Sequence, residues 1–192
     1  IDYNSVLSVS PGVEARTANR KSVNSLTKLH PVRCFACCYR GDLVSIRRFV
    51  AEGGKIDSPY LESYERHWNK AMGGDDYSWA EPGLGTTPLN YTLAFCDIIG
   101  LHSAAEVVSV LLELGADVNR DDGDPGVRYT PLHSAIANES PSLVRMVIQQ
   151  GAGVNKPRKD GRIPLHTAMR LPGGQHKLSI MGMLLVVGAS ID

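Results

Sequence analysis

Long apolar runs are absent from this sequence. No segment approaches the roughly 18 to 20 apolar residues of a membrane helix, and the N-terminus lacks the charged start, apolar stretch and cleavage site of an export signal. The 192 residues are 43% hydrophobic and 21% charged, as in ordinary globular proteins. We therefore expect an intracellular protein without membrane insertion, in the cytoplasm or the nucleus.

Catalytic motifs are absent as well. The chain has no Gly-x-Ser-x-Gly, no phosphate-binding glycine loop and no His-Glu-x-x-His. We therefore expect neither an enzyme active site nor a cofactor within these residues. The formal net charge is zero, which disfavours nucleic acid as a ligand because phosphates are held mainly by surplus Lys and Arg.

Residues 129–155 have the pattern of a helical hairpin. Thr130 and the proline after it form a helix start, because the hydroxyl can cap the helix and proline needs no amide hydrogen at the first position. Ser140 and its proline repeat this start, and Gly151 supplies the left-handed residue that closes the second helix. Each helix carries an apolar stripe on one side only. Such a unit cannot bury a core alone, so it needs neighbours of the same kind.

The same letters return 33 residues later, since "TPLHSA" begins at Thr130 and "IPLHTA" at Ile163. The closing sequences "GADVN", "GAGVN" and "GASID" recur in the same way. This spacing and these motifs resemble the ankyrin repeat family, in which a turn and two helices stack into a solenoid. The resemblance implies an all-α ankyrin-repeat solenoid of about four helix-turn-helix units, two of them regular and two modified.

We expect the repeat domain to span residues 32–192, and residues 1–31 to be an N-terminal cap or a flexible segment. The four units lie near residues 32–57, 86–119, 130–155 and 163–192. Residues 58–85 form a long inserted loop between the first two, and the second and fourth hairpins carry about seven and four extra residues. Because the chain begins at Ile1 and ends in "GASID", we expect it to be part of a longer protein.

The chain has four cysteines: Cys34, Cys37, Cys38 and Cys96. The spacing of the first and second matches one half of a zinc site, but no second pair follows, and His30 and His102 lack the required spacing. In the repeat register the first three occupy positions of core residues, which favours packing of small thiols. We expect no metal, with a zinc-binding regulator as the alternative. Buried free thiols also suit a reducing compartment.

His133 and His166 hold the same place in two copies of the repeat. A histidine three positions after a cap can bond backbone groups at the turn. Catalysis would require a nucleophile or an acid at a matching place, and the sequence offers none. We therefore interpret both histidines as structural.

Aromatic residues are few, but the inserted loop holds five of the twelve: Tyr60, Tyr64, Trp68, Tyr77 and Trp79. A helix that begins after Ser58 would place Leu61, Tyr64, Trp68 and Met72 on one apolar face. One alternative is that this face packs on the solenoid. The other is that the five aromatics anchor a partner, as interface hot spots do. Both hold if the helix packs while Tyr77 and Trp79 remain exposed.

Charge is uneven along the chain. The net charges of residues 1–50, 51–85, 86–124 and 125–192 are +5, −4, −6 and +5. We call residues 120–126 ("RDDGDPG") the acidic finger and residues 156–162 ("KPRKDGR") the basic finger. Neighbouring fingers of a solenoid project along one side, so a ligand with both signs would fit best. Arg158, Lys159 and Arg162 are the candidate contacts for an acidic partner.

The leading hypothesis, implied by the resemblance, is an intracellular protein-protein interaction module. It would act as a monomer and bind a partner protein through its concave face, finger loops and aromatic insertion. The alternative is a substrate-recognition or targeting arm of a larger enzyme or effector whose catalytic part lies outside this chain. Neither hypothesis identifies the partner.

The resemblance also implies a modification site. Closing asparagines of this family can be hydroxylated by an asparaginyl hydroxylase, and Asn119, with Asp117 two residues before it and Leu111 eight before it, matches that pattern. Asn155 matches it less well, because Gly153 replaces the aspartate. The alternative is that Asn119 stabilises the turn through its own backbone.

Overall fold

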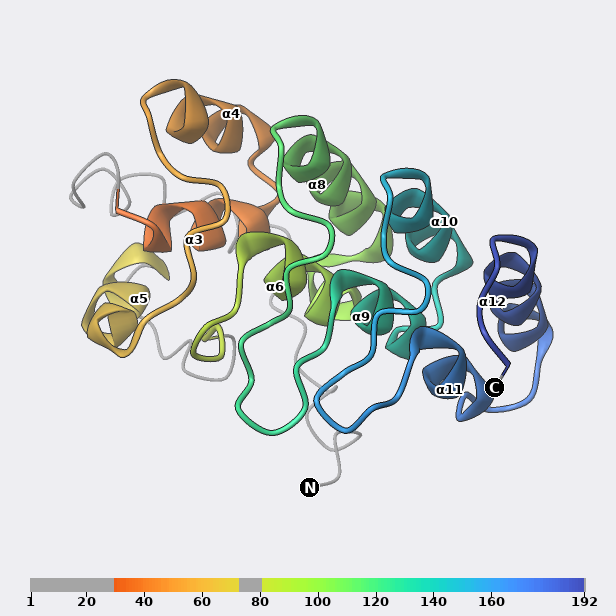
Figure 1. Ribbon diagram of the computed structural model, residues 1–192. Coiled ribbons are helices and arrows are strands. Elements are labelled where there is room, and N and C mark those ends of the chain that lie inside the picture. Colours follow the sequence, from red (N-terminus) through yellow and green to blue (C-terminus); the bar gives the residue numbers. More distant parts are fainter. Residues whose placement is uncertain (1–29, 73–80, 192) are drawn as a thin grey trace.

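The computed structural model describes residues 30–72 and 81–191, and this part of the chain is an all-α repeat solenoid without strands (Figure 1). Eight helices form four antiparallel pairs: α3 (Val32–Arg40) with α4 (Leu43–Ala51), α6 (Pro88–Ala94) with α8 (Leu101–Glu113), α9 (Pro131–Ala137) with α10 (Pro141–Gln149), and α11 (Pro164–Met169) with α12 (Gln175–Val186). Each pair lies within one of the four expected units.

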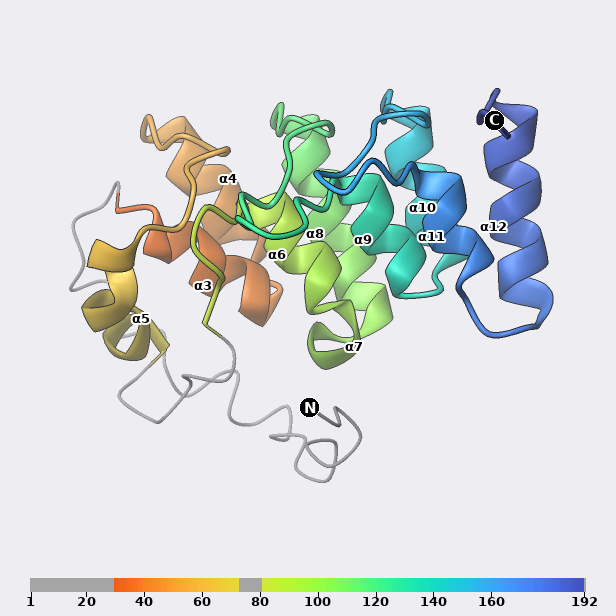
Figure 2. The same cartoon turned by 60° about the horizontal axis from the view of Figure 1, so that its bottom comes forward.

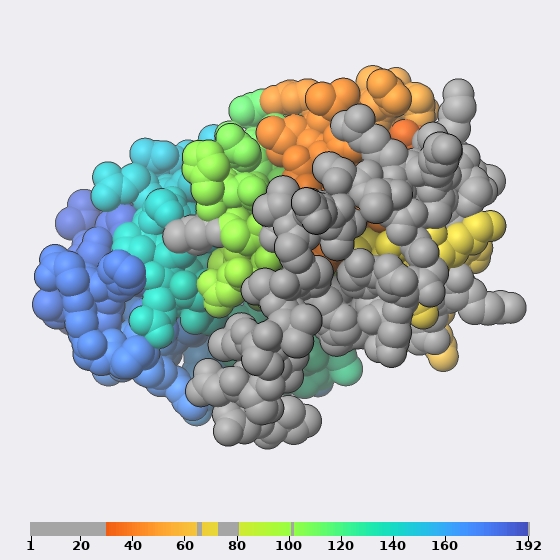
Figure 3. All heavy atoms as spheres, turned by 180° about the vertical axis from the view of Figure 1, so that it is seen from behind, coloured from red at the N-terminus to blue at the C-terminus, as the bar shows by residue number. Residues whose placement is uncertain are grey.

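The pairs stack side by side in two rows. Helices α3, α6, α9 and α11 form the inner row, and α4, α8, α10 and α12 form the outer row (Figure 1). The connections that lead from α8 to α9 and from α10 to α11 lie at the same end of the helices (Figure 2). Seen from behind, the pairs follow one another across the molecule in chain order (Figure 3).

Three of these eight helices start at a short side chain that caps the backbone. Asp42, Thr87 and Ser140 accept hydrogen bonds from the backbone N–H three residues on, at 3.1, 3.3 and 3.4 Å. Such caps satisfy an amide that has no partner inside the helix. The predicted cap by the Thr130 hydroxyl is wrong, because this hydroxyl instead bonds the Nδ1 atom of His133 at 2.8 Å.

One continuous core runs between the two rows. The apolar stripes read from the sequence supply it, and Leu132, Ala135, Ile136, Leu143, Val144 and Val147 are all fully buried. Each pair covers the apolar face of its neighbour, which a single hairpin could not do. None of the helices in the described residues is long and apolar enough to span a membrane.

The extra residues of the second unit form an additional turn of helix. Helix α7 (Cys96–Ile99) follows α6, and Gly100, with φ +91°, separates it from α8. Helix α8 has 13 residues, compared with 9 in α10. In the fourth unit the extra residues form the loop before α12, which has 12 residues.

The inserted segment contains a short 3₁₀ helix, η2 (Glu62–Tyr64), and helix α5 (Glu65–Met72). Helix α5 packs against α3 at the end of the inner row, and both ribbon views place it there. It therefore covers one side of the first unit. Of the N-terminal segment 1–31, for which a cap was predicted, residues 1–29 lie outside the described residues.

Candidate functional site

Two aromatics proposed as partner anchors lie in the core. Tyr60 and Trp68 are both 0% exposed, so the idea that they present a binding surface is wrong in this structure. Their rings meet edge to face at 6.3 Å, and each also contacts a ring of the inner row, Phe35 at 5.6 Å or Tyr91 at 6.0 Å. The insertion packs on the solenoid because these rings bury a large apolar area.

The other members of the aromatic set differ in position. Tyr64 is partly buried against the same core, with its ring 5.7 Å from that of Tyr60. Tyr77 and Trp79 lie outside the described residues. The prediction that these two contact a partner therefore stays a prediction from sequence.

Successive units are joined by a row of equivalent polar side chains four residues after each closing glycine: Asp57, Asn119 and Asn155. Each accepts a hydrogen bond from a backbone N–H of the next unit, at 3.1, 2.7 and 2.7 Å. The two asparagines also donate from Nδ2 to the carbonyl of the next closing glycine, at 3.1 and 3.0 Å. The carboxylate of Asp57 has no N–H, so it cannot donate a hydrogen bond to the carbonyl of the next closing glycine.

These contacts bear on the proposed hydroxylation site. Both side-chain polar atoms of Asn119 are bound to the following unit, and its own N–H donates to Asp117 Oδ1 at 2.8 Å. The side chain thus has a structural role, which its turn-forming tendency suggested. Hydroxylation of Asn119 stays a prediction.

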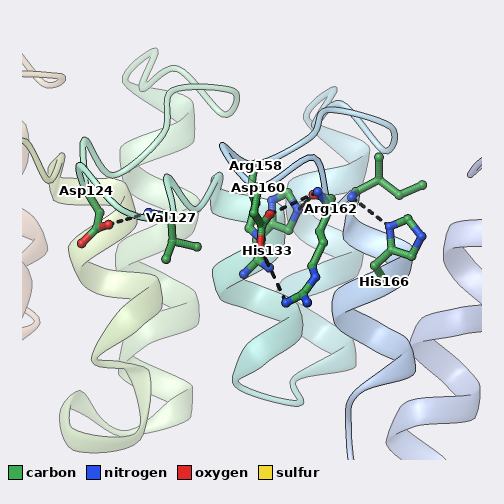
Figure 4. Close-up of polar contacts among 8 residues, drawn as sticks. Asp124, Val127, His133, Arg158, Asp160, Arg162 and His166 are labelled. Carbon is green, nitrogen blue, oxygen red and sulfur yellow. Dashed lines mark hydrogen bonds and ion pairs between the residues drawn. The ribbon is translucent and has the colours of Figure 1, made fainter.

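His133 bridges the inner row and the basic finger. Its Nε2 atom lies 3.2 Å from the carbonyl oxygen of Arg162 (Figure 4). Its Nδ1 atom lies 2.8 Å from the Thr130 hydroxyl. A carbonyl can only accept, so Nε2 carries the proton and the hydroxyl donates to Nδ1. Burial lowers the pKa of His133 from 6.5 to about 4, so the ring is neutral at pH 7. His166 is exposed, and its Nδ1 accepts from the Ile163 N–H at 3.2 Å.

The two fingers are folded-back loops that touch each other. Asp122 N–H donates to the carbonyl of Tyr129 at 2.9 Å within the acidic finger's hairpin, and Arg158 N–H donates to the carbonyl of Arg162 at 2.9 Å within the basic one. Between them, Lys159 N–H donates to the carbonyl of Val127 at 3.0 Å. Backbone bonds therefore fix the distance between the fingers.

On its other side the acidic finger touches the end of the insertion. Gly85 and Gly123 have φ of +84° and +70°, and a Cβ built on Gly123 would lie 2.7 Å from the Gly85 Cα atom. Thr86 also donates from its hydroxyl to the carbonyl of Asp122 at 3.4 Å. Only glycine allows the two backbones to approach this closely.

The three basic residues chosen from the sequence do not share one environment. Lys159 and Arg162 are exposed, but Arg158 is only 8% exposed, which corrects its prediction as a surface contact. Its guanidinium lies 4.8 Å from the centroid of the Tyr129 ring and pairs with Asp160 at 2.8 Å. Stacking on an aromatic face and pairing with a carboxylate explain how the charge is buried.

A cavity of about 350 Å³ opens between the two fingers. It is lined by Asp121, Arg128, Thr130, Lys156, Pro157, Arg158 and Lys159. Sequence reasoning missed Arg128 and Lys156. Lys156 could have been found in the sequence, because it is the first residue of the basic finger. Arg128 could not, because only the folded-back loop brings it to the cavity.

The cysteines behave as core residues. All four are buried and free. Burial raises the pKa of Cys37 and of Cys96 to about 12, so these thiols are protonated at neutral pH. Within residues 30–72 and 81–191, no three His, Cys, Asp or Glu side chains are grouped so that they could hold a metal ion.

The two-row stack, the closing turns and the finger loops define a helical repeat protein. Residues 101–192 match the family model described as Ankyrin repeats (3 copies). This match and the repeated helical pairs support an ankyrin repeat protein, and ankyrin repeats are protein-protein interaction modules. Helices α3 to α7 precede the matched residues, and the structure adds α3, α4 and α6 to the same two rows.

Curated relatives carry the same repeat in their names. The chain is 34% identical over 95 residues to "Ankyrin repeat and SOCS box protein 6" of Mus musculus, which covers 49% of this chain and 21% of that protein. It is 32% identical over 122 residues to "BTB/POZ domain and ankyrin repeat-containing protein NPR3" of Oryza sativa subsp. japonica, which covers 60% of this chain and 20% of that protein. The matched part thus spans about a fifth of each relative.

Proposed function

We propose that this chain is an intracellular module that binds a partner protein through its finger loops and the adjoining face of the inner helices. The supporting observation is the surplus of positive charge at the basic finger. Lys156 and Lys159 have no ion pair among the described residues, and Arg162 shares Asp160 with Arg158. Charged groups that fixed loops hold along one side of a rigid solenoid are suited to recognising a surface of complementary charge.

The partner is a protein and not a nucleic acid. The acidic finger lies directly beside the basic one, so a continuous phosphate backbone along the fingers would meet three aspartates. A protein segment can alternate its charges and match both fingers. We propose that the chain acts as a monomer and that it performs no catalysis itself.

A second proposal is that the chain is the recognition arm of a larger protein. The names of the relatives join ankyrin repeats to a SOCS box or to a BTB/POZ domain. In that case the same fingers would select the protein on which the remaining domains act. The two proposals share the binding surface and differ in what the binding achieves.

The proposed function is tested by affinity capture from native lysate. We compare the chain with a Lys159→Glu/Arg162→Glu variant and with a control, Arg48→Glu/Arg145→Glu, which reverses the same charge at exposed sites of the outer row. We expect a partner that is retained by the control and lost by the finger variant. A Tyr77→Ala/Trp79→Ala variant tests the aromatic contribution.

Three results would contradict the use of the fingers. The partner could survive the finger variant, it could be lost equally with the control, or nuclease treatment of the lysate could release it. Circular dichroism and thermal unfolding of each variant show whether the fold is intact, so that a loss of binding reflects the surface.

A further inference from the structure

Positive charge is concentrated in the cavity between the fingers. Four of its lining side chains are cations and one, Asp121, is a carboxylate. Arg128, Lys156 and Lys159 form no ion pair in the part of the chain that the structure describes. The cavity therefore carries charge that the protein itself does not neutralise.

The two lysines are held in place by neutral groups. The Nζ atom of Lys156 donates to the carbonyl of Asn119 at 2.6 Å, and that of Lys159 donates to the carbonyl of Pro125. An ammonium has three donors, so each lysine keeps two for another acceptor. Backbone carbonyls orient these cations without consuming their charge.

Arg158 supplies an unused donor at the base of the same cavity. Its side chain is 6% exposed, and its Nε atom is buried without a hydrogen-bond partner among the described residues. Leaving a buried donor unpaired is costly, so such groups call for an explanation. Nearby Arg128 adopts φ +59°, a left-handed conformation that is uncommon for non-glycine residues.

We propose that this cavity holds one anionic side-chain group, a carboxylate or a phosphate ester, on a segment of the partner protein. The inference rests on the proposed function and makes it more specific. A volume of about 350 Å³ is at the small end of the roughly 300 to 1,000 Å³ of ligand sites, which suits one or two side chains. Arg128, Lys156 and Lys159 supply charge-assisted hydrogen bonds to the anion. The buried guanidinium of Arg158 adds positive electrostatic potential at the same cavity.

The neighbouring charges restrict what may flank this group. Asp121 lines the cavity, and Asp122 and Asp124 lie in the same acidic finger. A second anionic group on that side would be repelled, whereas Lys or Arg would be attracted. The recognised segment therefore has an acidic residue with basic residues beside it.

The test uses three short peptides and amide chemical shifts recorded on the whole chain. One peptide carries a single glutamate between Gly and Ser residues and ends in two lysines. In the second peptide glutamine replaces glutamate, and in the third phosphoserine replaces it. We expect shifts confined to residues 121, 128–130 and 156–162 with the first or the third peptide, and none with the second. The stronger of the two binders identifies the anion as carboxylate or phosphate.

An Arg128→Gln/Lys156→Gln variant is expected to weaken this binding at least about tenfold, because two charge-assisted hydrogen bonds are lost. The Arg48→Gln/Arg145→Gln control, which removes the same charge elsewhere, is expected to retain it. Equal binding of the glutamine peptide, an unaffected variant, or stronger binding of a single-stranded oligonucleotide would overturn the inference. If the cellular partner is still captured by the Arg128→Gln/Lys156→Gln variant, the proposed function stands and the cavity assignment fails.

Discussion

The junction between the first two units and the junctions further along the stack are held by different interactions. At the first, the buried rings of Tyr60 and Trp68 pack against rings of α3 and α6, in addition to the hydrogen bond that Asp57 accepts. At the later ones, the closing asparagines and His133 connect one unit to the next through hydrogen bonds. Burial of apolar area is strong and non-directional, whereas hydrogen bonds add less free energy but fix the register. One solenoid thus combines both kinds of junction.

The largest expected effect comes from breaking the aromatic junction. Trp68→Ala removes a fully buried ring and should lower the free energy of unfolding by about 3 to 5 kcal/mol, measured by urea denaturation. Leu61→Ala in the same insertion is the control, because this side chain is 46% exposed and its loss should change stability by no more than about 0.5 kcal/mol. Equal effects of the two substitutions would contradict the role of α5 as part of the core.

The next largest expected effect is a pH dependence of stability, which comes from His133 between the third and fourth units. The folded-state pKa of His133 is about 4 against 6.5, so the unfolded chain binds a proton more readily. The stabilisation is therefore complete above pH 6.5 and is lost as the pH falls toward 4, by up to about 3 kcal/mol.

This pH dependence is measured by urea denaturation of the wild type and of His133→Gln between pH 7.5 and 4.5, where carboxylates affect both proteins alike. We expect a flatter profile for the variant. His166→Gln is the matched control, because it makes the same substitution at the equivalent position of the next unit, where the ring is exposed. A variant profile as steep as that of the wild type would assign the acid sensitivity to other groups.

The smallest expected effect separates the three closing positions. Asn119→Ala removes two hydrogen bonds to the next unit and should cost about 2 kcal/mol, whereas Asn119→Asp retains the acceptor and should cost about 1 kcal/mol. Asp57→Asn should have the opposite sign, because an amide could donate to the carbonyl of Gly115 as Asn119 does to that of Gly151. A loss of stability for Asp57→Asn would show that the first junction has a different geometry.

Much of the fold could be predicted because the same local sequence signals recur in several repeat units. Prolines at the first helical position, caps such as Ser140 and closing glycines such as Gly151 are local signals, and local signals are readable in sequence. The all-α solenoid follows from them and is confirmed. The prediction failed at Thr130, because its hydroxyl does not cap the helix but forms a hydrogen bond with the ring of His133.

The site could be predicted only in part, because it depends on contacts between distant residues. The basic finger was visible as a run of Lys and Arg, but burial of Arg158 requires the ring of Tyr129, which lies 29 residues earlier in the chain. Trp68 and Tyr60 looked like surface anchors because a helix with one aromatic face has the same sequence whether it meets the protein or a partner. Only the neighbouring rings of the inner row, Phe35 and Tyr91, show that Tyr60 and Trp68 pack on the protein itself.

The contact between Gly85 and Gly123 determines how closely the end of the insertion approaches the acidic finger. The two backbones touch here, while the helices pack through bulky side chains. A methyl group at either glycine would meet the other backbone and push the two loops apart. The spacing of these loops, and with it the size of a ligand that could contact both, therefore depends on the absence of two side chains.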